Sequence, residues 1–353
     1  MLSYRENLSA LPSYDGVEKD YRVKVNANES TLGLPPLVEE RVLNRLGLVA
    51  LNRYPNEEYY SLVEQIARNF SVANEQVLLG SGSSEIIEKV FHAFGGAGRK
   101  IVYPQPSFSM YKIYAKAAEA DAVPFDLDAK FDLDVDAFIK KVRESHASLA
   151  VVCNPNNPTG NVLTLAQVEE IAKSIDCAFL LDEAYVEFYG KSAFALVKSY
   201  PNLIVARTFS KAYGLAGARV GYMIAQAEVT RMIQKTFMPY HLNTLSLAAA
   251  DIVYQMRDEF VPRIQMTVAE RQRMFERLKK LSGVEIFPSQ TNFLLIRLAR
   301  AAELAEYLEA MEIGVRYFSP TAAGLKNCLR ISIGTRMEND EVFAAIKNFV
   351  EGR

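Results

Sequence analysis

The 353-residue sequence has no tryptophan, only three histidines and three cysteines, and no excess of positive charge. Its 40 lysines and arginines are nearly balanced by 42 aspartates and glutamates, which gives a net charge of -2. A chain with this balance has no global basic field that would attract nucleic acid or a membrane surface. Any anionic ligand must therefore be held by local arginines.

The few cysteines and histidines are scattered. Cys153, Cys177 and Cys328 lie far apart and show no C-x-x-C spacing. Isolated thiols of this kind indicate free, buried cysteines in a reducing compartment, and not a disulfide framework. His92 and His146 have no partners at ligand spacing, so we expect no metal site.

Long apolar runs are also missing. No stretch approaches the roughly 18 apolar residues that a membrane-spanning helix needs. Residues 1–7 contain no apolar core of a secretion signal. The sequence therefore predicts a soluble, cytoplasmic protein.

What the chain does have is a regular alternation of short apolar runs with segments of helical periodicity. Half of its residues are apolar, enough for a sizeable core. Strands are predicted at residues 76–80, 100–103, 122–125, 149–153, 178–181, 203–207 and 220–224. Helices are predicted at residues 37–48, 59–70, 86–94, 111–119, 135–144 and 165–175. Apolar strands between helices are typical of an α/β fold with a mostly parallel sheet, whose ligands bind at the carboxyl ends of the strands.

Three regions are predicted. Residues 1–35 are polar and irregular and form an N-terminal arm, and residues 36–245 form the large domain. Residues 246–353 form a smaller α/β domain. Its expected elements are a long helical stretch at 246–281, strands at 284–288, 292–298, 314–317 and 328–333, and helices at 301–311 and 339–349.

Lys211 follows a predicted strand in a run rich in polar groups. The hydroxyls of Thr208 and Ser210 precede it, and Arg219 lies eight residues after it. A lysine in this setting suits a Schiff base to an aldehyde that also carries a phosphate, such as pyridoxal phosphate. Taken alone, a lysine after a strand is usually a solvated surface residue.

Asp182 comes at the end of another predicted strand. A carboxylate at a buried sheet edge needs a cationic partner, and a protonated pyridine nitrogen would satisfy it. That pairing keeps the ring electron-accepting. Tyr185, three residues later, can donate to the ring's phenolic oxygen. The alternative for Asp182 is a cap on the next helix.

Two turns complete the candidate site. Residues 154–160, Asn-Pro-Asn-Asn-Pro-Thr-Gly, form a rigid turn that would hold the Asn157 amide at the end of a strand. Ser83 and Ser84 lie where a strand passes into a helix, and backbone N–H groups at a helix start favour phosphate. A capped helix start explains this second turn about as well.

These features occur together with Asn-Ala-Asn-Glu at residues 26–29, Arg-Tyr-Pro at 53–55 and Leu-Arg-Ile-Ser-Ile-Gly-Thr at 329–335. The whole set resembles the fold-type I pyridoxal-phosphate aminotransferases of the aspartate aminotransferase superfamily. Within it, the chain is most similar to the histidinol-phosphate aminotransferase family. The resemblance covers nearly the whole chain.

The resemblance implies a role for each cofactor-side residue. Lys211 would form the imine with pyridoxal phosphate, and Asp182 would pair with the pyridine nitrogen. Asn157 and Tyr185 would bind the phenolic oxygen. Phe108 matches the aromatic that stacks on the cofactor ring, with ordinary core packing as the alternative. The phosphate would be held by backbone and side-chain donors of Ser83, Ser84, Thr208, Ser210 and Arg219.

The resemblance also implies a substrate side. Arg330 matches the arginine that grips the anionic end of the substrate, and Arg316 resembles a second anion contact, with a solvated surface role as its alternative. Tyr14 and Asn28 resemble substrate-side residues of the arm. Tyr54 matches the tyrosine that reaches the phosphate from the neighbouring subunit, which implies a homodimer.

The chain departs from the family pattern in three places. Many relatives carry asparagine at the position of Ser30 and aspartate at the position of Ser84, which weakens a side-chain role for residue 84. Residues 239–243 also differ in detail from the usual segment and place His241 near the expected entrance.

The implied reaction is a ping-pong transamination in histidine biosynthesis. Histidinol phosphate and 2-oxoglutarate would interconvert with imidazole-acetol phosphate and glutamate, with the freed Lys211 amine moving the Cα proton. An aromatic or broad-specificity aminotransferase and a threonine-phosphate-type decarboxylase remain alternatives. The ligand-sensing half of a transcription regulator would need an attached DNA-binding module, for which residues 1–35 are too short.

Overall fold

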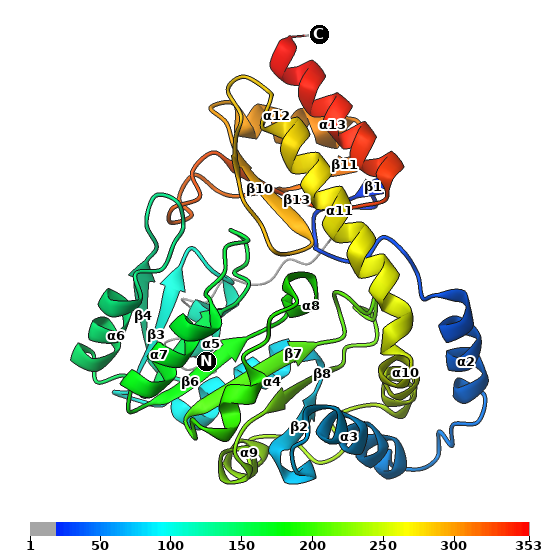
Figure 1. Cartoon of the computed structure of the whole chain (residues 1–353), viewed down its shortest axis with the longest axis vertical. Coiled ribbons are helices and arrows are strands. Elements are labelled where there is room, and N and C mark those ends of the chain that lie inside the picture. The colour runs from blue at the N-terminus through cyan, green and yellow to red at the C-terminus, as the bar shows by residue number, and fades with distance from the viewer. Residues whose placement is uncertain (1–18, 353) are drawn as a thin grey trace, which may run out of the picture.

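A central sheet organises the structure, a computed structural model in which residues 19–352 are described (Figure 1). Within that range the sheet has seven strands in the order β2-β8-β7-β6-β5-β3-β4. All neighbouring pairs from β7 to β4 are parallel, and β8 runs antiparallel to both β7 and β2. The strands are β2 (Val77–Gly80), β3 (Lys100–Gln105), β4 (Asp121–Asp126), β5 (Leu149–Cys153), β6 (Ala178–Asp182), β7 (Leu203–Thr208) and β8 (Gly221–Ile224). The predicted α/β fold with a mostly parallel sheet is confirmed.

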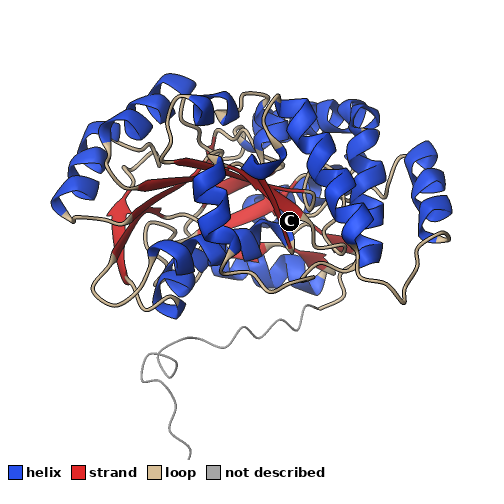
Figure 2. Ribbon diagram, turned by 90° about the horizontal axis from the view of Figure 1, so that it is seen from below, coloured by secondary structure: helices blue, strands red, loops and turns tan. Residues whose placement is uncertain are grey.

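The inner strands are almost entirely buried because helices cover both faces of the sheet (Figure 2). Successive residues of β7 alternate between the two cores, with Leu203 and Val205 in one and Ile204 and Ala206 in the other. The first core also contains residues of α2 (Pro36–Leu46), α3 (Asn56–Phe70), α6 (Val135–Glu144), α7 (Leu165–Ser174) and α10 (Thr244–Gln255). The second contains residues of α4 (Gly82–Phe94), α5 (Met110–Ala117) and α9 (Ala227–Gln234).

A second, smaller sheet lies above the first in Figure 1. In the described chain it is antiparallel, in the order β12-β13-β10-β9. Its core is shared with α11 (Val261–Leu278), α12 (Ala301–Ala310) and α13 (Arg336–Glu351). The strands are β9 (Glu285–Phe287), β10 (Phe293–Arg297), β12 (Arg316–Tyr317) and β13 (Cys328–Ser332).

The end of the predicted arm is part of this smaller unit. Residues Val23–Lys24 form β1, which pairs in parallel with β11 (Ile313–Gly314). Val23 and Val25 are buried in the core of the small sheet. The arm is therefore anchored in the core of the small sheet before it reaches the large one.

Two predicted elements differ from the structure. The helical stretch at 246–281 is broken, because α10 ends at Gln255 and α11 begins at Val261 with a proline in its first turn. Proline cannot donate the backbone hydrogen bond that a helix interior requires. The single strand predicted at 314–317 divides between β11 and β12, which belong to different sheets.

The division into arm, large and small domains remains a prediction. Helix α10 packs on α2 and α3 in the core of the large sheet, so core contacts continue past the expected boundary at residue 245.

Among residues 19–352, no helix combines the length and apolar character needed to cross a membrane.

Candidate functional site

Three predicted site residues meet where neighbouring parallel strands end. Asn157 follows β5, Asp182 is the last residue of β6, and Lys211 follows β7. The pairing register aligns Asp182 with Cys153 on one side and with Ala206 on the other. Because these strand ends lie level with one another, the turns after them share one crevice, as the sequence predicts.

Asp182 is a buried carboxylate with two neutral donors. The Tyr111 hydroxyl donates to Oδ2 at 2.9 Å, and the backbone N–H of Ala184 donates to Oδ1 at 3.1 Å. Burial raises the pKa of Asp182 to about 6, and the two hydrogen bonds limit the rise. The carboxylate does not cap a helix, so the functional interpretation is favoured over that alternative.

Lys211 points toward the arm, where its Nζ donates to the carbonyl oxygen of Ala27 at 3.1 Å. Burial, together with the positive charge of Arg330, lowers the pKa of Lys211 to about 8. A lysine with such a pKa reaches its neutral, nucleophilic form close to physiological pH.

The first turn of α4 is a cradle of backbone groups. Ser83 and Ser84 lie in this turn directly after Gly82, which has a φ of +74°. A Cβ on Gly82 would lie 2.6 Å from Nη2 of Arg219. Gly221 is the first residue of β8. A Cβ on it would collide with the Ser83 nitrogen and lie 2.6 Å from the Gly82 carbonyl carbon. Two glycines therefore permit the guanidinium and strand β8 to approach the helix start closely.

The hydroxyls before Lys211 join the same cluster. Thr208 donates to the Ser210 hydroxyl at 2.9 Å, and Nη1 of Arg219 donates to that hydroxyl at 3.3 Å. Thr208 and Ser210 are buried, and Arg219 is exposed with a left-handed φ of +54°. The predicted phosphate-binding residues thus lie together.

Arg330 connects the small sheet to this crevice. Its Nη1 donates to Oδ1 of Asn157 at 2.6 Å, and its Nη2 donates to the Asn26 carbonyl at 2.8 Å. Its guanidinium lies 5.4 Å from the centre of the Phe293 ring. Its buried Nε has no hydrogen-bond partner in the described chain. Burial lowers the pKa of Arg330 to about 10.

Arg316 lies directly across from Arg330 in the antiparallel register of β12 and β13. Residues paired in this way point to the same face of a sheet. Arg316 is exposed, and its charge contributes to the lowered pKa of Arg330. The two guanidinium groups form a cationic pair at the edge of the crevice.

The arm residue Asn28 lies at the centre of a buried network. Its Nδ2 donates to the Tyr185 hydroxyl at 3.0 Å, and its backbone N–H donates to Oγ of Ser332 at 2.9 Å. Nδ2 of Asn292 donates to the Asn28 carbonyl at 3.1 Å. Burial raises the pKa of Tyr185, which therefore keeps its proton as a donor. The network holds the arm between the two sheets.

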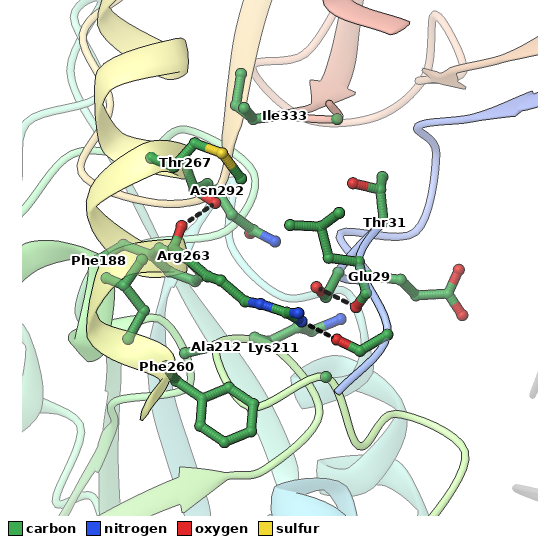
Figure 3. Close-up of a pocket in the computed structure, with 17 residues that line it drawn as sticks. Glu29, Thr31, Phe188, Lys211, Ala212, Phe260, Arg263, Thr267, Asn292 and Ile333 are labelled. Carbon is green, nitrogen blue, oxygen red and sulfur yellow. Dashed lines mark hydrogen bonds between the residues drawn. The ribbon is translucent and has the colours of Figure 1, made fainter. Parts of the chain in front are cut away.

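A cavity of about 30 Å³ lies beside Lys211 under this part of the arm (Figure 3). Arg263 of α11 crosses it and donates to the carbonyls of Gly33 and, at 3.3 Å, Leu34. Asn292 also lines the cavity. The arm is thus tied to α11 on one side and to the lysine on the other.

The remaining predicted residues have different positions. Phe108 meets Tyr111 edge to face, with ring centres 5.5 Å apart. Tyr54 is 70% exposed and stacks on Tyr240 at 4.1 Å, away from the residues around Lys211. Tyr14 lies outside the described residues. The stacking role of Phe108 and the roles of Tyr54 and Tyr14 stay predictions.

Two contributors were not predicted from the sequence. Tyr111 donates to Asp182, and Ser332 both accepts from and donates to Asn28. Tyr111 has the apolar spacing of an ordinary core residue, and Ser332 follows Arg330 at the period of a strand, which was the one available signal. His241 lies beside β2 and the first turn of α4, with Nε2 3.2 Å from the Leu79 carbonyl and 3.8 Å from Oε2 of Glu85. In residues 19–352, no group of three or more potential ligand side chains is placed to hold a metal ion.

Comparisons with known proteins agree with this geometry. Residues 23–346 match the model of the family aminotransferase class I and II. The chain is 34% identical to the histidinol-phosphate aminotransferase of Clostridium novyi (strain NT) over 344 residues, 98% of this chain and 96% of that protein. It is 36% identical over 346 residues to the histidinol-phosphate aminotransferase of Thermoanaerobacter sp. (strain X514), covering 98% of each.

Solved structures share the fold. The histidinol-phosphate aminotransferase of Sinorhizobium meliloti, in complex with pyridoxal-5'-phosphate, superposes with a TM-score of 0.89 at 24% identity, covering 99% of this chain and 98% of that one. L-threonine-O-3-phosphate decarboxylase of Porphyromonas gingivalis superposes with a TM-score of 0.81 at 26% identity, covering 93% and 99%.

The lowered pKa of Lys211 leads to a test of its reactivity. Only the neutral amine attacks an aldehyde, so the rate at which the cofactor-free chain captures pyridoxal phosphate should rise about tenfold per pH unit and level off near pH 8. Stopped-flow absorbance of the visible lysine adduct measures this rate. Lys211→Arg is the control and should form no adduct. A rate that still rises steeply at pH 10 would show an ordinary lysine.

Proposed function

Because this chain belongs to the aminotransferase class I and II family, and within it to the histidinol-phosphate aminotransferases, we propose that it transfers the amino group of histidinol phosphate to 2-oxoglutarate with pyridoxal phosphate as cofactor. Family membership confirms the predicted enzyme class and cofactor. The observation that carries the assignment is the meeting of Asp182, Lys211 and Arg330 in one crevice.

The residues present fit pyridoxal phosphate. Among the described residues, no lysine or arginine forms an ion pair with the buried Asp182, so its carboxylate suits a protonated pyridine nitrogen. Tyr185 has a hydroxyl for the phenolic oxygen. The turn at the start of α4, with Ser210 and Arg219, suits the phosphate. When bound, the cofactor supplies an electron-accepting ring for the chemistry at Cα.

Lys211 is placed to move the proton. With a pKa near 8, its Nζ can accept a proton from the substrate's Cα and later donate it. The Ala27 carbonyl at 3.1 Å holds Nζ at the arm side of the crevice. Asp182, the last residue of β6, would instead pair with the ring nitrogen, so the two groups have separate roles.

The arginines are suited to an anionic substrate. The Nε of Arg330 is buried without a partner in the described chain, and the fork of a guanidinium binds phosphate or carboxylate through two parallel hydrogen bonds. Arg316 adds a second positive charge on the same face. One pair of groups can therefore accept first the phosphate of the donor and then a carboxylate of 2-oxoglutarate.

A half-reaction with single substrates tests the proposed donor. Histidinol phosphate should abolish the visible absorbance of the lysine-bound cofactor at micromolar concentration, because its phosphate engages Arg330 and Arg316. Phenylalanine, tyrosine and glutamate serve as comparison donors and are measured in the same spectrophotometer. Lys211→Ala should lack the absorbance of the lysine-bound cofactor and should transfer the amino group of no donor.

Two outcomes would contradict the proposed substrate. A response to phenylalanine without one to histidinol phosphate would indicate an aromatic or broad-specificity aminotransferase. Release of carbon dioxide from threonine phosphate would indicate a decarboxylase, the activity named for the P. gingivalis protein.

The exposed aromatic surface near Tyr54 supports a homodimer as the working unit. Tyr54, Tyr60, Met238 and Tyr240 are all exposed, with Leu48 and Leu51 nearby in the chain. Large contiguous apolar surface of this kind marks interaction sites. We place Tyr54 of one subunit at the phosphate of the other.

The cytoplasmic location stays a prediction.

Mixing inactive variants tests this shared site. Lys211→Ala and Tyr54→Ala subunits should each have low activity, and their mixture should recover up to about half of the wild-type activity per hybrid dimer, because one site then has both intact residues. The control mixes Lys211→Ala with Asp182→Ala, which lie in the same subunit's site and should not complement. Absence of recovery in both mixtures, with subunit exchange shown by mass, would place Tyr54 outside the neighbouring site.

A further inference from the structure

We propose that Tyr111 is a positioning residue that keeps the Asp182 carboxylate ionised and oriented toward the cofactor's ring nitrogen. The proposal rests on the proposed function in so far as it concerns the cofactor. The contact that supports it is the hydrogen bond of 2.9 Å that the Tyr111 hydroxyl donates to Oδ2 of Asp182.

The tyrosine ring is held in one position. Tyr111 is the second residue of α5 and is 0% exposed. It stacks on Phe91 at 6.1 Å and meets Tyr103 edge to face at 6.2 Å. A ring enclosed in this way cannot swing its hydroxyl away from Asp182, so the donor is fixed before any ligand arrives.

Tyr111 also contacts a second predicted cofactor residue. Phe108, expected to lie against the cofactor ring, packs edge to face on Tyr111 at 5.5 Å. One side chain therefore supports both the carboxylate and the aromatic that would bracket the ring. Phenylalanine would give the same packing, so the hydroxyl is distinguished by its polar contacts, which are Asp182 and the neutral thiol of Cys153.

The hydroxyl alters the charge of Asp182. A hydrogen bond to the ionised form of an acid lowers its pKa, and Tyr111 provides the larger of the two such contributions that oppose burial. Other groups facing Asp182 do not replace it. Raised pKa values keep Cys153 on β5, Tyr114 on α5 and Tyr185 neutral. The negative charge of Glu183 raises the pKa of Asp182 and so favours its protonation.

Tyr111→Phe removes the hydroxyl and keeps the ring. In the full chain stripped of cofactor, the pKa of Asp182 should rise by about one unit or more, since a hydrogen bond to a charged group is worth at least about tenfold. The carboxyl ¹³C resonance, assigned by its loss in Asp182→Asn, measures this value. A purely structural role for Tyr111 would leave it unchanged.

The pH dependence of cofactor binding gives a second measurement. A protonated Asp182 must lose its proton to pair with a pyridinium, so affinity for pyridoxal phosphate falls below the Asp182 pKa. In Tyr111→Phe the midpoint of this fall should move up by the same unit, which is about a tenfold weaker affinity at pH values below both midpoints. In the Asp182→Asn background, Tyr111→Phe should have no further effect.

Tyr103→Phe is the matched control, because it deletes a buried tyrosine hydroxyl one ring away and should leave both the resonance and the midpoint in place. An unchanged Asp182 pKa in a folded Tyr111→Phe protein would overturn the proposal. That result would leave the proposed transamination untouched. A wild-type protein that ignores histidinol phosphate would instead overturn the substrate, while the ¹³C measurement on the cofactor-free chain would still decide the role of Tyr111.

Discussion

The site depends on one constraint, a carboxylate that is buried at the end of β6 with no cation beside it among residues 19–352. Burial raises the pKa of Asp182 to about 6, above the 3.8 of a free aspartate. An acid with a raised folded-state pKa destabilises the fold progressively as the pH rises from about 4 through 6. Ionised Asp182 is therefore a strained element of the cofactor-free chain at neutral pH. A cationic ring nitrogen would stabilise the ionised carboxylate, so binding of the cofactor should also stabilise the fold.

The arm makes a crevice between two sheets into a closed site. Its backbone carbonyls accept hydrogen bonds from Lys211 at Ala27 and from Arg330 at Asn26. The backbone N–H of Ser332 donates to Val25, and Asn28 binds both Ser332 and Tyr185. Three consecutive arm residues thus connect Lys211, Arg330 and Tyr185. Any movement of the small sheet relative to the large one must therefore move these arm residues or break their hydrogen bonds.

Much of this arrangement could be predicted from the sequence. Apolar runs between helical segments indicate parallel strands, and polar residues directly after three of those runs must gather at one sheet edge. That reasoning places Asn157, Asp182 and Lys211 together without knowledge of the fold. The order of the remaining elements was less accessible, because an apolar run such as β8 has no mark of direction, and it proves antiparallel.

What could not be predicted depends on contacts between distant segments. The hydroxyl of Tyr111 meets Asp182 across 71 positions of sequence, and the spacing of Tyr111 is that of any core aromatic. The pairing of Arg316 with Arg330 depends on a strand register, and the divided strand at residues 313–317 depends on β1 arriving from the arm. Each of these contacts is decided by tertiary packing, and the local periodicity of the sequence carries no information about it.

The most direct test of the account is the protonation state of the cofactor's ring nitrogen in the wild-type protein. The ¹⁵N chemical shift of bound, ring-labelled pyridoxal phosphate reports it. A carboxylate that needs a cation predicts a nitrogen that stays protonated at pH 8 and above, and that loses its proton there in Asp182→Asn. An unprotonated nitrogen at pH 8 in the wild-type protein would contradict the role given to Asp182 and the account built on it.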